Sequence, residues 1–423
     1  MFSIFRACFG TRAVRKALLL QAATIAIVAH PAFAEELTLD DAIRRVLAAA
    51  PQNAATAAQV EALTANRDAV SLRPRPSLEV ATENFGPPVG DLYDQFQVTA
   101  TYSQQIERGG KREARVALAE RQIDVVGAQA LTQRLDLIAG VQLAYVEVQA
   151  AEAGIEVMRQ RLAIARDFET EVARRVASAR DPSFAGTRAR TAVAEAEVDL
   201  ELAVHARDAA LVRLSLWWGG PAEGLVVPLG LFLDLDTVSG PIEPAAADVA
   251  IYQVRGAQAD AAIAVEQANS TRDVTVSGGP RIIGNGDVGF VAGVSIPLGG
   301  RRLTEARVLE AQAARRRIDA EREVELFQLR RALTLAAERV EEARHEAEAV
   351  QDRVLPGAEQ ALREVRLGYD RGFFSFADVA AAQTAVTNAA SRTVEAASEY
   401  HAARVELDRL TGRFTTLAQE AIR

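Results

Sequence analysis

The chain has 423 residues, of which 48 are basic and 57 acidic, and Cys8 is its only cysteine. A chain of this length can form two or three domains. The excess of acidic residues argues against a nucleic-acid-binding protein, because such binding depends on clustered basic residues.

Residues 1–34 are predicted to form a secretory signal peptide. An apolar stretch at 17–28 is followed by Ala32-Phe33-Ala34, which has the small-residue pattern of a cleavage site. The stretch is shorter than the about 20 residues that a membrane-spanning helix needs, and an uncleaved anchor is the alternative. Four basic residues precede it: Arg6, Arg12, Arg15 and Lys16.

Removal of this signal leaves 44 basic and 57 acidic residues, a net charge of −13. It also removes Cys8, so the mature chain has no disulfide, no thiolate metal site and no cysteine nucleophile. Cys8 precedes the apolar stretch, unlike the lipid-bearing cysteine of a lipoprotein. No later segment has 18 consecutive apolar residues, so a membrane-inserted form would have to be a closed β-barrel.

The first half of the mature chain predicts a helix, two strands, a long helix and a shorter helix. The first helix is expected at 38–72, with Thr38 and Asp41 spaced as in a capping box. Strands are expected at 76–85 and 93–106. In the second strand the two faces differ, because side chains alternate along a strand. One face carries Phe96, Val98, Ala100, Tyr102 and Ile106, and the other carries Gln95, Gln97, Thr99, Thr101, Ser103 and Gln105.

This alternation is typical of outer-membrane strands, which place apolar side chains toward lipid and polar ones toward a wet lumen. A soluble β-sandwich shows the same alternation. The sequence predicts only four such strands in each chain, whereas the smallest membrane barrels have about eight strands. Three chains would supply twelve, so oligomerisation would allow a barrel to close.

The segment 111–178 contains no proline and would form a helix of roughly 100 Å at about 1.5 Å per residue. Apolar residues recur along it at heptad spacing, which is typical of coiled coils. An ordinary antiparallel coiled coil without a channel is the alternative reading of the helices. The seam residues are Val141, Ala144, Val148, Ala151, Ile155, Met158, Leu162, Ala165 and Val172.

The second half repeats the first. The segment 109–116 (GGKREARV) recurs at 299–308 as GGRRLTEARV, and each copy opens a long helical stretch. Each stretch breaks once, near Arg180-Asp181-Pro182 and near 368–372, and each half ends at glycine, Gly219 or Gly412.

The second half predicts a helix at about 244–270 and strands at 273–283 and 287–297. Its long helix is expected to bend at Pro356. A second heptad seam runs through Leu326, Leu329, Leu333, Ala336, Val340, Ala343, Ala347, Val350 and Val354. The predicted organisation is therefore a signal at 1–34, a first repeat at 35–219, a linker at 220–243, a second repeat at 244–413 and a tail at 414–423.

Two letter patterns carry no catalytic prediction. Gly284-x-Gly286-x-x-Gly289 matches a dinucleotide fingerprint, but it lies between strands, and Asn285-Gly286 is a hairpin signal. The histidines at 205, 345 and 401 are far apart in sequence, so no metal site is predicted. No nucleophile–base pair is evident. We therefore expect no cofactor and no enzymatic activity.

Six segments in order give the mature chain a resemblance to the TolC-like outer-membrane efflux proteins (outer membrane factors), and in particular to their CzcC-like branch. The resemblance covers nearly the whole mature chain. The segments are 37–43 with Pro51, 74–79, 105–112, 296–298, 355–359 and 368–379.

The resemblance implies a mainly α protomer with two structural repeats, four transmembrane strands and long coiled-coil helices. Three protomers would form a 12-stranded β-barrel in the outer membrane and an α-helical barrel in the periplasm. The partners it implies are outer-membrane lipid, a periplasmic adaptor (membrane fusion protein) and an inner-membrane pump of the resistance-nodulation-division type. The channel would export metal cations or small toxic compounds passively, with energy supplied by the pump.

The same resemblance places a periplasmic aperture and an adaptor-docking tip at the two helical turns. The aperture residues would be Tyr369, Phe374 and Asp378. Three copies of Asp378 would form a carboxylate ring that favours cations, although a carboxylate there also suits the first turn of a helix. The tip residues would be Gly368, Gly372, Phe373, Phe376, Asp181 and Pro182.

The sequence also departs from the TolC pattern in this turn. Phe374 replaces an arginine and Ala381 replaces a second carboxylate, so a salt-bridged closure is in question and an apolar plug is the alternative. Two other functions remain open at this point. One is a type I protein secretion channel, and the other is a periplasmic coiled-coil adaptor that never enters a membrane.

Overall fold

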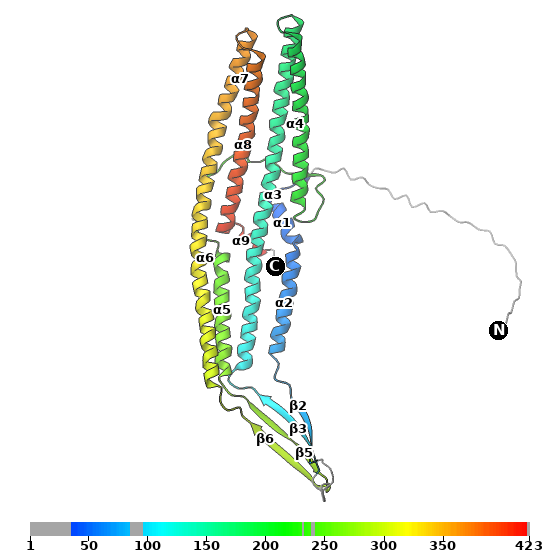
Figure 1. The fold of residues 1–423 in the computed structure, drawn as a ribbon, viewed down its shortest axis with the longest axis vertical. Coiled ribbons are helices and arrows are strands. Elements are labelled where there is room, and N and C mark those ends of the chain that lie inside the picture. The colour runs from blue at the N-terminus through cyan, green and yellow to red at the C-terminus, as the bar shows by residue number, and fades with distance from the viewer. Residues whose placement is uncertain (1–34, 85–95, 231, 238–241, 421–423) are drawn as a thin grey trace, which may run out of the picture.

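A computed structural model describes residues 35–84, 96–230, 232–237 and 242–420, and it shows an elongated protomer. Long helices run side by side through most of its length, and a single four-stranded sheet continues from one end of them (Figure 1). The two helical turns lie together at the opposite end. The predicted mixed, mainly helical fold is confirmed.

The two halves have the same element order. The first half contains α1 (Leu39–Ala49), α2 (Pro51–Val70), β2 (Ser77–Glu83), β3 (Gln97–Ile106), α3 (Lys111–Ala177) and α4 (Ser183–Ser215). The second half contains α5 (Ala246–Asn269), β5 (Val274–Ile283), β6 (Val288–Ser295), α6 (Arg301–Ala349), the π-helical segment η2 (Val350–Val354), α7 (Leu355–Asp370) and α8 (Phe376–Thr411). Two short strands, β1 (Glu35–Glu36) and β4 (Leu225–Val226), and a final helix, α9 (Thr415–Glu420), complete the described chain.

The expectation of one helix over 38–72 was wrong, because the chain forms two. Thr38 caps α1 by accepting a hydrogen bond from the backbone N–H of Asp41, as predicted. Ala50 then adopts an extended backbone, with ψ of 117°, immediately before Pro51 at the start of α2. A residue that precedes proline is sterically disfavoured in the helical region, which explains the break.

The sheet has the order β2-β3-β5-β6 and is antiparallel throughout. The register places Leu78 opposite Tyr102, and Val276 opposite Val294, on one face. This face is apolar and exposed in the protomer. Its exposed side chains include Leu78, Val80, Phe96, Tyr102, Val276, Ile282, Val288, Phe290, Val294 and Ile296. Residues 93–95 of the predicted second strand lie outside the described residues.

The opposite face of the sheet is polar. Arg281 lies opposite Thr99, and its Nε donates to the threonine hydroxyl oxygen at 3.0 Å. The same guanidinium lies 3.9 Å from a carboxylate oxygen of Glu83. The alternation predicted for the strands is thus present across the whole sheet.

Helix α3 is 67 residues long and packs against α4, α5, α8 and α2. Most of its predicted seam is buried, including Val141, Val148, Ile155 and Val172. The second predicted seam is buried from Leu329 to Val350 and then ends. Val354 was expected to continue it, but this side chain is 45% exposed.

The π-helical segment explains why the second seam ends. A π turn contains one residue more than an α turn, and one α-helical residue corresponds to a rotation of about 100°. Residues after Val350 are therefore shifted in phase, and burial resumes at Leu362 and Tyr369 rather than at Val354. Pro356 follows directly, at the start of α7, where its missing N–H leaves one helical bond unmade.

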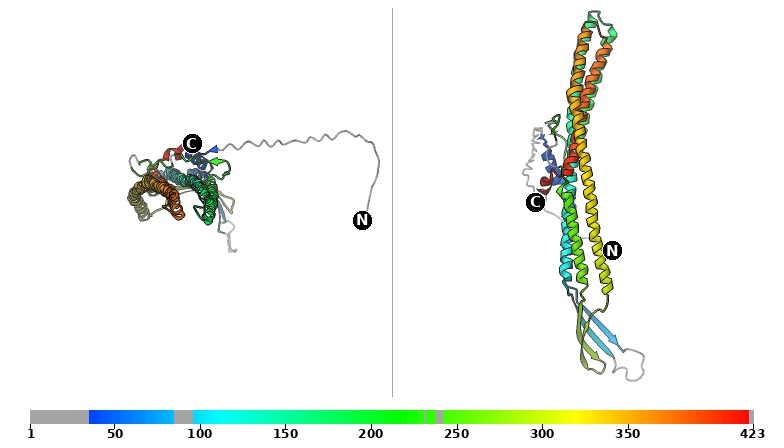
Figure 2. Two further views of the ribbon diagram at one scale, coloured as in Figure 1. Left: turned by 90° about the horizontal axis from the view of Figure 1, so that it is seen from above. Right: turned by 90° about the vertical axis from the view of Figure 1, so that its left-hand side faces the viewer.

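A collar lies against one side of the helices, near the middle of their length (Figure 2). It consists of α1, α9 and residues 220–230 and 232–237. Its core brings together side chains from distant parts of the chain, namely Leu37, Ile43, Leu135, Ile138, Leu214, Leu225 and Ala418. Strands β1 and β4 pair in parallel within it. The segments predicted as a linker and a tail both contribute to this core. No helix in the described ranges contains a stretch long and apolar enough to cross a membrane.

Candidate functional site at the helical tips

The predicted tip residues come together at one end of the protomer. The turn between α3 and α4 and the turn between α7 and α8 lie at the same end of the molecule (Figure 1). A core of their own joins the two hairpins, formed by Phe168, Val172, Ala185, Ala189, Leu362, Tyr369, Val379 and Val386. The tip is therefore a packed unit within one protomer.

Asp181, Arg175 and Tyr369 form a network across the two hairpins. Arg175 lies in the last turn of α3, and its Nε is 2.8 Å from Asp181 Oδ2 in the turn that follows. The Tyr369 hydroxyl donates to the same carboxylate. Arg175 also donates to the backbone oxygen of Tyr369 at 3.1 Å, and its guanidinium lies 4.2 Å from the centre of the tyrosine ring.

This network is largely shielded from solvent. Tyr369 is only 2% exposed. Hydrogen bonding from Arg175 holds the pKa of Asp181 below its usual range, so the carboxylate is charged near neutral pH. Burial and the neighbouring Asp181 carboxylate raise the pKa of Tyr369, so it remains a hydrogen-bond donor. A charge-assisted network of this kind fixes one hairpin against the other.

A pair of carboxylates, Glu171 and Asp370, lies beside this network. Burial, followed by the hydrogen bond with Asp370 and the like charge of that residue, raises the pKa of Glu171 to about 7. Arg366 and Arg175 act in the opposite direction but do not outweigh these effects. One carboxylate oxygen of Glu171 is buried without a hydrogen-bond partner among the described residues. Glu171 is therefore half-protonated near neutral pH.

Asp378 closes a capping box at the start of α8. The backbone N–H of Ser375 donates to Asp378 Oδ2 at 2.8 Å, and the backbone N–H of Asp378 donates to the Ser375 hydroxyl oxygen at 3.3 Å. These hydrogen bonds lower the pKa of Asp378. One of the two roles predicted for Asp378 was to stabilise the first turn of a helix, and it has that role within this chain. Its side chain remains charged and exposed.

The three phenylalanines of the turn have different environments. Phe373 is 77% exposed, whereas Phe374 packs its ring against the Cα of Gly368, where a side chain would collide with it. Phe376 is half-buried, and the centre of its ring lies 5.2 Å from that of Phe168. The Arg188 guanidinium lies over the Phe376 ring, 4.9 Å from its centre. Of these three rings, Phe373 is the most available to a partner.

Backbone geometry accounts for two further predicted tip residues. Gly372 has a φ of 83°, a left-handed conformation that favours glycine, and it ends α7. The N–H groups of Gly372 and of Phe373 bond back to the carbonyls of Tyr369 and Gly368. Pro182 caps the start of α4. Both residues shape the turns, and neither carries chemistry of its own.

Sequence reasoning did not identify Arg175, Phe168, Arg188 or the pair of Glu171 and Asp370. A signal existed for Arg175, because a basic residue in the last turn of a helix commonly interacts with groups just beyond its end. The other contacts join residues 188 to 208 positions apart and depend on how the two hairpins pack. The described residues contain no group of three or more histidine, cysteine or acidic side chains arranged to hold a metal.

The chain is similar in sequence and in fold to known proteins. The family model described as outer membrane efflux protein matches residues 42–220. The cobalt-zinc-cadmium resistance protein CzcC of Cupriavidus metallidurans is 27% identical over 321 residues, covering 74% of this chain and 77% of that protein. The nickel and cobalt resistance protein CnrC of the same species is 29% identical over 299 residues, covering 68% and 71%.

Solved structures show the same fold. Crystal structures of CusC, described in connection with transmembrane channel formation, match with a TM-score of 0.70 at 15% identity over 90% of this chain and 93% of that chain. The outer membrane protein VceC of Vibrio cholerae matches with a TM-score of 0.64 at 18% identity, covering 88% and 95%. The chain is therefore similar to outer membrane efflux proteins over residues 42–220, and its fold is that of these solved structures.

Proposed function

We propose that this protein is the outer-membrane channel of a tripartite efflux system that exports metal cations. It acts as a homotrimer, receives its substrate through a periplasmic adaptor from an inner-membrane pump of the resistance-nodulation-division type, and conducts passively. The observation that carries the proposal is a two-faced sheet at one end of helices about 100 Å long. The relatives named for metal resistance support the choice of substrate class.

The sheet supports the membrane part of the proposal. Its apolar face leaves Phe290, Val288 and Val294 more than 60% exposed, which is unfavourable in water and suits contact with lipid. Its other face carries hydroxyls, Glu83 and Arg281, which suits a wet lumen. Three sheets of four strands would close a twelve-stranded barrel without unpaired edges.

The tips support the periplasmic part of the proposal. We propose that Tyr369, Phe374 and Asp378 form the aperture and that the surrounding turns, including Asp181, Pro182, Gly368, Gly372 and Phe376, shape an adaptor-docking surface. Phe373 provides the exposed apolar contact on that surface. The charged, exposed carboxylate of Asp378 can take part in a ring of three while it caps its own helix.

The first test measures the protein extracted from the outer membrane of a Gram-negative host. We expect a trimeric mass in mild detergent and discrete, cation-preferring openings in a planar bilayer. A host that lacks its own metal-efflux channel should regain tolerance to zinc, cobalt or cadmium when this channel is supplied with its pump and adaptor. A monomer without conductance, recovered in the soluble periplasmic fraction, would refute the proposal.

Replacement of Asp378 tests the aperture. Asp378→Asn removes the charge but keeps a side-chain oxygen that can accept the capping hydrogen bond. We therefore expect cation preference to fall several-fold while thermal stability stays within about 1 kcal/mol of the wild type. The matched control is Glu338→Gln, an exposed carboxylate on α6 far from the tip. Equal ion selectivity in both variants would exclude a carboxylate ring at Asp378.

A further inference from the structure

Basic residues gather where the sheet meets the helices. They flank all four strands at this end, and we call this set the basic junction: Arg73, Arg75, Arg108, Lys111, Arg112, Arg272, Arg301 and Arg302. The sequence between β2 and β3 and that between β5 and β6 contain no lysine or arginine. Apart from Arg281, which lies near the far end of β5 on the polar face, the basic residues of the sheet region lie at the end that faces the helices.

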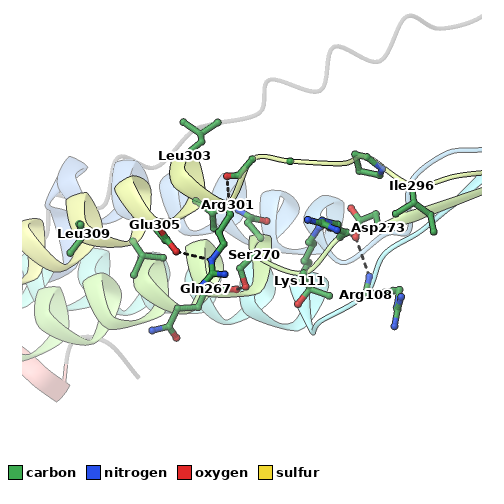
Figure 3. Close-up of a pocket in the computed structure, with 18 of the residues that line it drawn as sticks. Arg108, Lys111, Gln267, Ser270, Asp273, Ile296, Arg301, Leu303, Glu305 and Leu309 are labelled. Atoms are coloured by element: carbon green, nitrogen blue, oxygen red, sulfur yellow. Dashed lines mark hydrogen bonds and ion pairs between the residues drawn. The ribbon is translucent and has the colours of Figure 1, made fainter.

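A cavity opens within the basic junction. It has a volume of about 1210 Å³ and lies between the end of α5, the exit of β3 and the start of α6 (Figure 3). Arg108, Lys111, Arg272 and Arg301 line it together with the apolar side chains of Ile296 and Leu303. One wall thus offers cations and another offers hydrocarbon.

Two of the lining cations are already neutralised. Lys111 lies 2.8 Å from Asp273, which also accepts from the backbone N–H of Arg108. Arg301 lies 2.9 Å from Glu305. The side chains of Arg108 and Arg272 have no acidic partner in the part of the chain that the structure describes, and both are exposed. The cavity consequently has two guanidinium groups available to an anion.

The apolar wall continues the lipid-facing surface of the sheet. Ile296, Leu298 and Leu303 follow β6 in sequence and are 48%, 87% and 60% exposed. They lead from the apolar face of the sheet to the mouth of the cavity. A ligand with an anionic head and a hydrocarbon tail would satisfy both walls at once.

We propose that this cavity binds the phosphate headgroup of an anionic glycerophospholipid from the membrane leaflet on the helical side of the sheet. Arg108 and Arg272 contact the phosphate, because the guanidinium fork matches phosphate oxygens in a bidentate geometry. The acyl chains lie along Ile296, Leu298 and Leu303. Basic pockets at a membrane surface recognise anionic lipids in this way. The proposal rests on the outer-membrane location of the proposed function and not on conduction.

The test measures lipid binding by delipidated protein in detergent. Phosphatidylglycerol and phosphatidylcholine are titrated separately, and bound lipid is counted by native mass spectrometry. We expect preferential binding of phosphatidylglycerol and an affinity roughly tenfold lower when both Arg108→Gln and Arg272→Gln are present. The matched control is Arg316→Gln, an exposed arginine on α6 that does not line the cavity, and this variant should bind like the wild type.

Two further variants and one competitor complete the design. Arg272→Gln alone removes a side chain that has no acidic partner among the described residues, so it should keep the fold while weakening binding. Leu298→Ser should weaken the binding of phosphatidylglycerol without creating a preference for phosphatidylcholine. Inorganic phosphate should not displace the lipid at equal concentration, because it lacks the apolar contacts. Equal binding of the two lipids, unchanged binding in the double variant, or displacement by equimolar phosphate would each overturn the proposal. Conductance is not needed for any of these readings.

Discussion

The hydrogen bond between the Tyr369 hydroxyl and the Asp181 carboxylate links the two tip hairpins directly. The two residues are 188 positions apart. Arg175 contacts both of them, because it pairs with the Asp181 carboxylate and lies over the Tyr369 ring. A buried hydroxyl that donates to a carboxylate contributes about 1.5–3 kcal/mol. One hydroxyl group therefore has a large share in holding the tip in its present arrangement.

Tyr369→Phe removes that hydroxyl and keeps the ring. We expect the tip to loosen, with a higher open probability in single-channel recordings and a loss of about 1–3 kcal/mol in stability. Tyr252→Phe is the control, since the Tyr252 hydroxyl makes only a 3.5 Å contact to Glu325, outside the tip. If both variants gate alike, the network does not restrain the aperture.

Glu171 gives the tip a dependence on pH. Its pKa in the folded protein, about 7, lies above its usual 4.5, so folding favours the protonated carboxyl. The folded state is therefore most favoured below about pH 4.5, and this contribution is lost as the pH rises toward and past 7. Protonation of Glu171 tightens the tip, and ionisation loosens it.

Glu171→Gln mimics the protonated form. Between pH 5 and 7.5 we expect the melting temperature of the wild type to fall relative to that of the variant, with the two converging at the acid end. Glu169→Gln controls for the general loss of a carboxylate, because Glu169 lies two residues away on α3 and has no ion-pair partner among the described residues. Parallel melting curves for wild type and Glu171→Gln at every pH would contradict the assignment.

At the scale of single elements, the sheet offers a paired test of its two faces. Val294 and Val291 lie on the same strand, β6, but on opposite faces, opposite Val276 and Gly279 respectively. Val294→Arg would place a charge on the lipid face, at a cost of about 2–4 kcal/mol near the membrane centre. Val291→Arg would place the same charge on the polar face that holds Arg281.

We expect Val294→Arg to be depleted from the outer-membrane fraction and Val291→Arg to be retained there. Immunoblots of separated membranes, normalised to total protein, measure the difference. The comparison between the variants is the readout, because both carry the same substitution in the same strand. Equal depletion would mean that β6 does not present Val294 to lipid.

Local sequence patterns predicted the helices and strands well wherever apolar residues recur at one constant spacing along the whole element. The strand alternation and the seam of α3 were readable because each rests on a single repeating interval. The prediction of the second seam was wrong at Val354, because the π turn shifts the helical phase there. The hydrophobic pattern does not show this shift, and the only nearby sequence signal is Pro356. The split at Pro51 was likewise detectable from the proline but was not predicted.

The candidate site was predictable only in part. The turns were located because Pro182, Gly368 and Gly372 mark helix ends. The partners of Tyr369 were not, because Arg175 and Asp181 reach it only after two hairpins from different halves of the chain have packed. Phe376 was assigned to a docking surface, whereas its half-burial against Phe168 follows from the same packing.

At the scale of the whole molecule, the collar joins parts of the chain that are almost its full length apart. Ala418 is fully buried among residues of α1, α3 and α4, and Phe414 and Leu417 pack beside it. The side chain of Arg409 bonds both Asp136 and Asp248, and so connects α8 to α3 and α5. These contacts stabilise the centre of a protomer that is otherwise long and thin.

Truncation after Gly412 removes α9 and tests this role. We expect a loss of about 2–5 kcal/mol, because several apolar side chains lose their partners and leave a cavity. Thermal unfolding in detergent measures the loss, and truncation after Glu420 is the matched control. Identical melting of the two truncated proteins would show that α9 does not contribute to the collar.

The collar also has a consequence for the order in which the molecule can be made. Leu37, near the start of the described chain, bonds through its backbone to Val226 and to the hydroxyl of Tyr145, and it shares a core with Ala418. Contacts between residues so distant in sequence form late and slowly. The segment around Leu37 therefore waits for the segment around Ala418, and the collar stays open to chaperones and proteases until both segments are available.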